Sequence, residues 1–564
     1  MLLITLDTTR KDALGCYGAK TPTPHLDAIA AQGARFDRAY TVTPVTLPAH
    51  TSLLTGTYPA YHGVRDNGPF RLVPGAVTLA ETLRRAGWST AGCISAFVLD
   101  RLFGLDQGFD HYDDDFQVKF GGTVGVEERD AGAVTDAALR WLDTSLRQPF
   151  FLWVHYFDPH QPLTAPEPYA KACDNPYTAE VVYVDAQIGR LIAALEQKGL
   201  TRNLLTVVVA DHGEALGEHG EATHGIFLYE ATLAIPLIVG GEGIEPGKHV
   251  PSLVSIVDVA PTILELLGLA IPDSMQGRSL APLLASGKPG ESTPLYIENH
   301  LTRLTYGWAP LSGVIQDALK YIEAPRPELY DITADPREAV NLVGERASEA
   351  RRLAQLTQAL REKHAPPDGV PWADQLELSE ESREKLKELG YLTPSPGEVE
   401  TTGIDPKDAL EENRLIDEAA LLQQNNRFEE AVALFKQILE RNPKNGWVLQ
   451  HLGTSLVGTG RYAEAIPYLE RAIESRRVIG PPLYNLAHAY ERTGRSAEAL
   501  ALIGEIREKN PKYTPAHQWL GLYHEARGEW PQAIDAYEAF LRHWKGDEAI
   551  GQRIRAKVEE LRKK

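Results

Sequence analysis

Acidic and imidazole side chains follow two apolar segments of this 564-residue chain, at places where metal ligands are common. Residues 2–6 form an apolar run that ends at Asp7, and residues 204–210 form a second run that ends at Asp211 and His212. Apolar runs of this length are typical of buried parallel strands. Ligand-binding groups of open α/β sheets lie at the carboxyl ends of such strands. We therefore expect these three side chains to lie at one edge of a sheet.

The donor atoms of these residues indicate the kind of metal. Carboxylate oxygen and imidazole nitrogen suit zinc, with manganese as an alternative, better than they suit a soft thiophilic cation. Each residue alone has an ordinary explanation, since an Asp after a strand often caps a helix and an Asp-His pair in a loop is often only solvated. The ordered set, placed at the ends of two apolar runs, favours a divalent metal site.

Residues 43–57 read T-P-V-T-L-P-A-H-T-S-L-L-T-G-T. This stretch resembles the C/S-x-P-S-R-x-x-L-L-T-G signature of sulfatases. Pro48 and the run 53–56 match the signature. However, Thr46 occupies the position of the Cys or Ser, and His50 occupies the position of the Arg. The frame is that of a sulfatase, but the residue at the nucleophile position is different.

The resemblance extends over roughly residues 1–395 and is carried by segments 2–18, 43–56, 62–67, 211–236, 328–331, 335–336 and 341–342. Together they resemble the sulfatase-like branch of the alkaline phosphatase superfamily. The resemblance implies an α/β sandwich with a central, mostly parallel sheet and a small C-terminal subdomain. It also places a metal on Asp7, Thr46, Asp211 and His212. A threonine nucleophile is similar to that of nucleotide phosphodiesterases and of lipid A phosphoethanolamine transferases.

The threonine at position 46 constrains the chemistry. A sulfatase Cys or Ser is oxidised to formylglycine, whereas the methyl group on the Cβ of Thr46 prevents conversion to that aldehyde. The hydroxyl must therefore attack as itself. Because a free hydroxyl is almost fully protonated at neutral pH, it needs a base or a metal to become a nucleophile.

The number of metals is less clear from the sequence. Two-metal members of the superfamily have an Asp-x-x-x-His pair, but four residues after Asp158 the chain has Pro162. Asp158, His160 and His224 remain candidates for a second site with different spacing. The resemblance to sulfatases gives His160 another role, contact with the ester oxygens. We favour one metal over two.

The resemblance implies covalent transfer through Thr46, with His160 and His224 stabilising the equatorial or leaving oxygen. Water or an acceptor alcohol would then release Thr46, so the reaction is a hydrolysis or a transfer. We interpret the remaining histidines of the catalytic region as structural, namely His50, His62, His155 and His219. Anion contacts are plausible for three further residues, Arg10, Lys11 and Asn67.

Composition limits the partners. The net charge of −20 argues against non-specific binding of nucleic acid, because a polyanion would be repelled. The three cysteines do not indicate a redox compartment, and no apolar window is long enough to span a membrane. Met1 runs straight into the first apolar run without a signal peptide, although relatives of this kind are usually exported, so the sequence does not predict the compartment.

A repeat occupies the C-terminal part. Ala431, Ala465, Ala499 and Ala533 are each 34 residues apart, and the same step separates Asn426, Gly460, Gly494 and Gly528. This period, with small residues at helix contacts and Gly at a turn, resembles the tetratricopeptide repeat. Stacked helical hairpins of this kind form a groove that generally receives peptides. We therefore expect a protein or peptide partner, with a purely structural role as the alternative.

These patterns predict three regions. Residues 1–345 form the catalytic domain, residues 346–408 a helical extension and linker, and residues 409–564 the repeat domain with a terminal capping helix at 557–564. Within the second region we expect a helix over 379–389 and a linker over 394–406.

Two classes of function follow. The first is a metal-dependent hydrolase or transferase that cleaves phosphate or sulfate esters of a small molecule, lipid or glycan, with phosphodiesters or phosphonate esters favoured over sulfate esters. The second is a catalytically inactive interaction scaffold. A true sulfuric ester hydrolase is a further alternative within the first class. Joint retention of Asp7, Thr46, Asp211, His212 and His224 favours an active enzyme.

Overall fold

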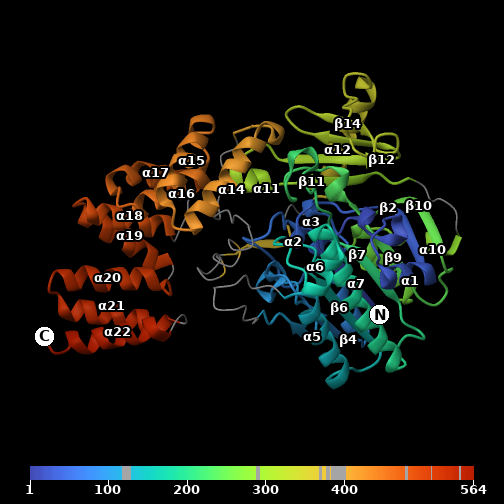
Figure 1. Ribbon diagram of the computed structural model, residues 1–564, viewed down its shortest axis with the longest axis horizontal. Helices are drawn as coiled ribbons and strands as arrows, with labels where there is room; N and C mark the ends of the chain where they lie inside the picture. Colours follow the sequence, from blue (N-terminus) through green and yellow to red (C-terminus); the bar gives the residue numbers. More distant parts are fainter. Residues whose placement is uncertain are drawn as a thin grey trace.

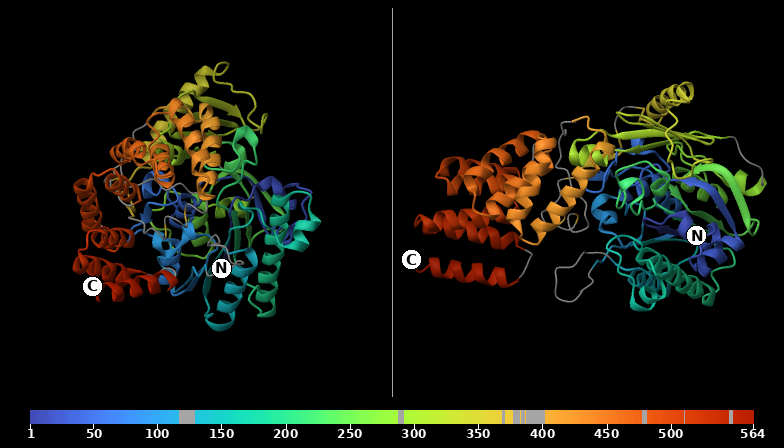
Figure 2. Two further views of the ribbon diagram at one scale, coloured as in Figure 1. Left: turned by 60° about the vertical axis from the view of Figure 1, so that its left-hand side comes forward. Right: turned by 45° about the horizontal axis from the view of Figure 1, so that its top comes forward.

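The computed structural model describes residues 1–116, 129–286, 292–367, 371–376, 382, 386, 402–476, 481–509, 511–544 and 548–564. It consists of an α/β part and a C-terminal stack of helices that lie side by side (Figures 1 and 2). Both agree with the predicted fold class. Most of the predicted helix at 379–389, most of the predicted linker and residues 117–128 lie outside the described residues.

The central sheet has nine strands in the order β10-β2-β9-β7-β1-β6-β4-β5, with β8 paired to β2. Its strands are β1 (Leu2–Leu6), β2 (Ala34–Tyr40), β4 (Ser89–Cys93), β5 (His111–Asp113), β6 (Phe150–Tyr156), β7 (Thr206–Ala210), β8 (Ala234–Ile235), β9 (Leu237–Gly240) and β10 (Lys248–Ser255). The pairs β1–β6, β1–β7, β4–β6, β4–β5 and β2–β10 are parallel, whereas β9 and β8 are antiparallel to their neighbours. Strands β1 and β6 are buried along their whole length, which explains their continuous apolar sequence.

Helices cover this sheet in two groups. One group packs around α7 and contains α1 (Pro24–Gln32), α5 (Ala131–Thr144), α6 (Glu167–Ala172) and α7 (Pro176–Gln197). The other packs around α2 and contains α2 (Thr46–Thr55), α3 (Pro59–His62), α4 (Leu79–Arg85) and α9 (Val259–Leu266). From β1 the chain crosses through α1 to β2, then runs in the opposite direction through α2 and α4 to β4, and returns through α5 to β6 and through α7 to β7. Because such crossovers are right-handed, the two directions place the two groups on opposite faces.

A second, smaller sheet lies beside the first. It is a four-stranded antiparallel meander of β11 (Leu295–Asn299), β12 (Leu311–Gln316), β13 (Leu319–Glu323) and β14 (Glu328–Asp331), covered by α12 (Ala347–Lys363). Short helix α11 (Leu301–Tyr306) follows β11. Residues 320–322 and 329–331 lie in β13 and β14, which pair antiparallel. A two-stranded ribbon joins β3 (Phe70–Leu72) to β15 (Ala373–Gln375).

The C-terminal helices form hairpins with the predicted period. They are α14 (Leu410–Gln424), α15 (Phe428–Arg441), α16 (Gly446–Gly458), α17 (Tyr462–Arg476), α18 (Pro481–Arg492), α19 (Ser496–Lys509), α20 (Thr514–Ala526) and α21 (Trp530–His543), followed by α22 (Glu548–Leu561). Asn426, Gly460, Gly494 and Gly528 all have a left-handed backbone, with φ of +58°, +76°, +84° and +73°. Glycine and asparagine tolerate this conformation best, which explains their recurrence at the turn of each hairpin. The terminal helix is longer than the 557–564 segment predicted to cap the stack.

The repeats pack against the small sheet through α11 and the residues after it. Trp308 is fully buried in one apolar cluster with residues of α14, α15 and α16. Its Nε1 donates a 3.3 Å hydrogen bond to Glu412 Oε1, which also accepts from Asn442 and Asn445. At the edge of the contact, Lys407 Nζ lies 2.7 Å from Glu328 Oε1. The first repeats are therefore attached to the catalytic part by a buried contact.

We expect Trp308→Ala to lower the free energy of unfolding by about 3–5 kcal/mol, because it removes a fully buried indole from this contact. Urea denaturation followed by circular dichroism measures the change. Arg414→Gln, on the exposed face of α14, is the control and should change stability by less than about 0.5 kcal/mol. Equal stability of Trp308→Ala and the parent would show that this contact does not hold the two parts together.

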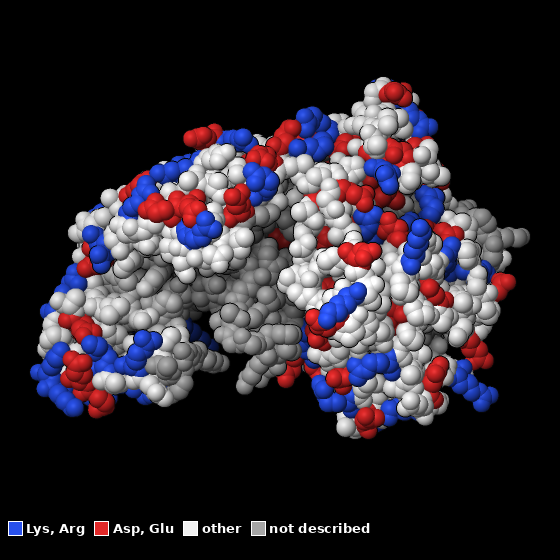
Figure 3. Space-filling view, viewed as in Figure 1, with Lys and Arg blue, Asp and Glu red and all other residues white. Residues whose placement is uncertain are grey.

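The described residues on one face of the molecule show no large patch of a single charge. On the face shown in Figure 3, Lys and Arg are interspersed with Asp and Glu over both parts of the molecule. No described helix has the length and apolar character needed to cross a membrane.

Candidate active site

Strands β1 and β7 bring the predicted acidic residues together. The two strands are adjacent and parallel, with Leu6 paired to Ala210, so Asp7 and Asp211 leave the sheet at the same edge. The backbone N–H of Asp211 donates to the Leu6 carbonyl at 3.2 Å, which continues the strand pairing to this point. Both carboxylates are fully buried. The expectation that both strand ends meet at one edge is confirmed.

Asp7, Asp211 and His212 have the geometry of a metal site. Their ligand atoms all lie within 4.8 Å of one another. His212 Nε2 lies 3.4 Å from Asp211 Oδ2 and 3.8 Å from Asp7 Oδ1. Both Asp7 oxygens and Asp211 Oδ2 lack a hydrogen-bond donor. Three converging carboxylate oxygens that have no hydrogen-bond partner among the described residues are suited to binding a cation.

The tautomer of His212 supports this assignment. His212 Nδ1 lies 3.0 Å from the Gly213 carbonyl oxygen, so Nδ1 carries the proton and donates it there. Nε2 therefore presents its lone pair to two carboxylates, which is unfavourable unless a cation lies between them. In the metal-free chain, burial raises the pKa of Asp7 and of Asp211 and lowers that of His212. The donor set fits a divalent ion such as zinc or manganese.

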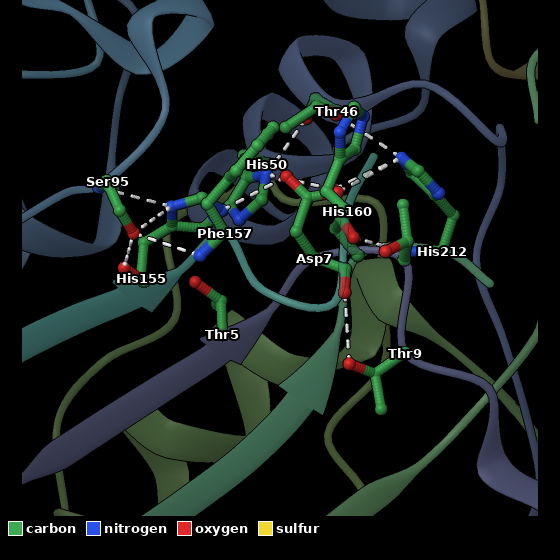
Figure 4. Close-up of polar contacts among 12 residues, drawn as sticks. Thr5, Asp7, Thr9, Thr46, His50, Ser95, His155, Phe157, His160 and His212 are labelled. Carbon is green, nitrogen blue, oxygen red and sulfur yellow. Dashed lines mark hydrogen bonds and ion pairs between the residues drawn. The ribbon is translucent and has the colours of Figure 1, made fainter. Parts of the chain in front are cut away.

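Thr46 is the first residue of α2 and is fully buried beside this cluster. Its Oγ1 lies 3.3 Å from His212 Nε2 (Figure 4). The Asn67 side chain fixes this end of the helix, because its Oδ1 accepts a 2.7 Å hydrogen bond from the Leu47 N–H. Val45, which precedes the helix, has no side-chain oxygen to accept this hydrogen bond. Asn67 therefore takes the place of the usual N-terminal capping residue.

His160 and His224 lie next to each other and to His212. The ring centroids are 5.1 Å apart for His160 and His224, and 4.5 Å apart for His212 and His224. His224 Nδ1 lies 3.2 Å from Glu214 Oε2. Burial alone would lower the pKa of His224, but the carboxylates of Glu214, Asp7 and Glu221 together hold that pKa above its usual value. The environment of His224 therefore favours its protonated form beside the proposed metal site.

Two histidines that we interpreted as structural contact the acidic residues directly. His50 Nδ1 lies 3.5 Å from Asp211 Oδ2, and His155 Nε2 lies 3.4 Å from Asp7 Oδ2. Burial lowers the pKa of each imidazole to about 3, so both are neutral. A signal for His50 was present in the sequence: four residues after Thr46 on a helix, it lies on the same face. His155 required the strand register, which pairs it with Thr5, two residues before Asp7.

Three other candidate residues, Asp158, Arg10 and Lys11, bond to groups outside the acidic cluster. Asp158 Oδ2 accepts a 2.6 Å hydrogen bond from the Ala131 N–H at the start of α5, and no described contact joins it to the acidic cluster. Arg10 is bound to Asp12 and Glu218. Lys11 donates to the Asp37 carbonyl. These contacts do not support a second metal site at Asp158 or anion contacts at Arg10 and Lys11.

Asn67 has an unused donor. Its Nδ2 is buried and has no hydrogen-bond partner among the described residues, while its Oδ1 caps α2 next to Thr46. His62 and His219 do bond elsewhere, to Ser52 and to the Arg337 carbonyl. The arrangement therefore offers a hydroxyl, a candidate cation site, an imidazole with a raised pKa and an amide donor within one buried region, which suits attack on a phosphorus or sulfur ester.

Comparisons with known proteins relate both parts of the chain to known families. The sulfatase family model matches residues 1–269, the model described as N-sulphoglucosamine sulphohydrolase, C-terminal, matches residues 217–365, and a tetratricopeptide model matches residues 422–478 and 456–523. Choline-sulfatase of Rhizobium meliloti is 28% identical over 402 residues, covering 57% of this chain and 77% of the relative.

Solved structures share the fold. A putative sulfatase from Bacteroides fragilis aligns with a TM-score of 0.56 at 22% identity, over 65% of this chain and 96% of that one. Phosphonate monoester hydrolase of Agrobacterium radiobacter aligns with a TM-score of 0.55 at 21% identity, over 67% and 98%. The α/β part of the chain therefore contains a sulfatase family domain of the alkaline phosphatase superfamily, which is consistent with an ester hydrolase, and it is joined to tetratricopeptide repeats.

Proposed function

We propose that the chain is a metal-dependent phosphodiester or phosphonate ester hydrolase whose nucleophile is the unmodified hydroxyl of Thr46. The observation that carries the proposal is the position of Thr46 Oγ1, 3.3 Å from His212 Nε2 and beside Asp7 and Asp211. A divalent cation on these four residues would supply positive charge that favours the deprotonated hydroxyl and draws in the ester oxygen.

The protein groups have separate roles in this proposal. Thr46 Oγ1 attacks phosphorus, the bond from phosphorus to the leaving oxygen breaks, and the phosphoryl or phosphonyl group stays on Thr46 until water removes it. Protonated His224 gives its Nε2 proton to the leaving oxygen, while Glu214 holds the other nitrogen. Asn67 Nδ2 and His160 bind the remaining ester oxygens. An acceptor alcohol in place of water would make the same reaction a transfer.

A sulfate ester is the second candidate substrate. The specific observation in its favour is the sulfatase family match together with the relative named choline-sulfatase. Against it, Thr46 does not form the aldehyde of the family, and His50 replaces the signature Arg. The solved relative named phosphonate monoester hydrolase shows that this fold accommodates phosphorus esters. The repeats, by family, are protein-interaction modules, and we propose a protein or peptide partner for them.

We expect turnover of aryl phosphodiesters or phosphonate monoesters to exceed turnover of aryl sulfates by at least about tenfold in kcat/KM, which corresponds to about 1.4 kcal/mol. Phosphorus accepts a fifth ligand in line and carries more negative charge for the site to offset. The assay compares matched nitrophenyl esters on metal-loaded protein whose mass shows an unmodified Thr46. Equal or greater efficiency with the sulfate would contradict the proposed substrate class.

The number of metals is a separate prediction. We expect His160→Ala and His224→Ala to lower kcat by about 100-fold, as loss of acid–base or oxyanion contacts does, without emptying the metal site. Metal content per chain, measured by mass spectrometry of the purified variants, should stay at one. Two ions in the parent and one in each variant would show that these histidines hold a second metal.

A further inference from the structure

A second pocket, of about 940 Å³, lies between the first part of the catalytic region and the small sheet. Its charged lining comes from four segments of the chain. Arg65 follows α3, Arg303 lies on α11, Glu323 ends β13, and Arg361 lies near the end of α12. The rest of its wall is largely apolar and includes Phe70. Thus three guanidinium groups face one cavity in a chain whose net charge is −20.

The carboxylates near this pocket do not neutralise all three arginines. Arg65 Nη1 lies 2.8 Å from Glu298 Oε1, and Arg361 Nη2 is bonded to Glu323. The guanidinium group of Arg303 has no hydrogen bond or ion pair among the described residues. Because Arg303 is half-buried, it lacks both a partner and full hydration, and an anion in the pocket would supply the missing contact.

His300 adds a neutral polar group to the same wall. Its Nε2 lies 3.0 Å from Arg65 Nη1, which donates to it. Burial, with help from the nearby guanidinium groups, lowers the pKa of His300 to about 4. The imidazole therefore adds no charge at neutral pH, and the surplus of positive charge comes from the arginines alone.

Two segments of the chain contribute residues both to the wall of the pocket and to the surroundings of the active site. Asn299 Nδ2 donates to the carbonyls of Gly225 at 2.7 Å and Ile226 at 3.0 Å, so the segment that carries His300 and Arg303 packs on the residues after His224. The segment that carries Arg65 continues to Asn67, whose side chain holds the first turn of α2 beside Thr46. Both walls of the pocket thus extend from segments that build the catalytic site.

We propose that this pocket binds an oxyanion group, such as a carboxylate, phosphate or sulfate, carried by the substrate itself at a distance from the ester that is cleaved. The inference rests on the proposed function of the Thr46 site. Arg303 is the main contact because its planar donors match two oxygens of such a group at once. Phe70 and the neighbouring apolar wall suit the uncharged body that joins the two ends of the substrate.

The test uses two matched probes, the mono-p-nitrophenyl ester of phenylphosphonate and the same ester with a carboxylate on the phenyl ring. In the full-length, metal-loaded parent we expect kcat/KM to be at least about tenfold higher for the carboxylated probe. Arg303→Gln should reduce this ratio to near one. Arg352→Gln is the matched control, because exposed Arg352 lies on the same helix as Arg361 but bonds to Gln316 outside the pocket, and it should keep the parental ratio.

Binding measurements keep this proposal separate from the proposed chemistry. If neither probe is turned over, the Thr46 mechanism fails, and calorimetry with Thr46→Ala still tests whether the carboxylated probe binds more tightly than the probe without a carboxylate. Equal ratios in the parent and Arg303→Gln, or equal affinities of the two probes, would overturn the pocket assignment. Free benzoate that accelerates turnover of the probe without a carboxylate would also overturn it, since the anion would then be a separate regulator.

Discussion

Thr46→Ala is expected to lower kcat/KM for the best phosphorus ester by about 1000-fold or more, because it removes the attacking oxygen. Thr46→Ser should stay within about tenfold of the parent, since it keeps the hydroxyl and loses only the methyl group. Steady-state kinetics on metal-loaded protein measure both changes. The pair separates the role of the hydroxyl from the role of side-chain volume at the start of α2.

Thr55→Ala is the matched control for this pair. Thr55 is the last residue of the same helix, and its hydroxyl bonds only to neighbouring threonine groups, at the Thr51 carbonyl and the Thr57 hydroxyl. Its loss should leave kcat/KM close to the parental value. Parental rates in Thr46→Ala with every ester tested would show that another group is the nucleophile.

Asp211→Ala is expected to remove both the metal and the activity. The metal content should fall from about one per chain to near zero, because Asp211 supplies an unpartnered oxygen of the three-residue cluster. In the parent, a metal at about 100 times its Kd stabilises the folded state by about 2.7 kcal/mol. We therefore expect zinc or manganese to raise the Tm of the parent and to leave the Tm of Asp211→Ala unchanged.

Asp158→Asn provides the comparison. Asp158 also follows a buried strand, but its carboxylate bonds to the Ala131 N–H at the start of α5. This variant should keep its metal and its metal-dependent rise in Tm. A parental metal content in Asp211→Ala, or loss of metal in Asp158→Asn, would mean that the cation is held by a different set of residues.

The sequence predicted the part of the site that depends on strand ends. Asp7 and Asp211 each follow an apolar run, and parallel strands of one sheet end at the same edge, so their meeting required no side-chain detail. The repeats were equally predictable, because a left-handed turn every 34 residues restricts each turn position to Gly or Asn.

The contacts that depend on register were not predictable from the pattern. His155 reaches Asp7 only because β6 pairs with β1 in the register that places it opposite Thr5. Asp158 has the same sequence context as Asp7, after an apolar run, yet it bonds the start of a helix. A pattern of apolar residues gives the end of a strand, but the direction of the next side chain depends on the neighbouring elements.

The pocket lined by Arg65, Arg303 and Arg361 could not be predicted from the sequence pattern either. Arg65, Arg303 and Arg361 are far apart in the sequence and belong to no common motif. They meet because α12 covers the small sheet, and because Arg65, after α3, bonds to Glu298 and His300 at the end of β11. The proposed domain boundaries at 345 and 408 stay predictions, since the buried contact at Trp308 crosses between the regions that they define.

The most direct test of the central claim is the mass of the covalent intermediate. The metal-loaded chain is mixed with a phosphonate ester, quenched in acid during turnover and digested, and the peptides are mapped by mass spectrometry. The account predicts a phosphonyl adduct on the hydroxyl of Thr46, in a peptide that is otherwise unmodified, and no adduct in Thr46→Ala. An adduct on any other residue during turnover would contradict it.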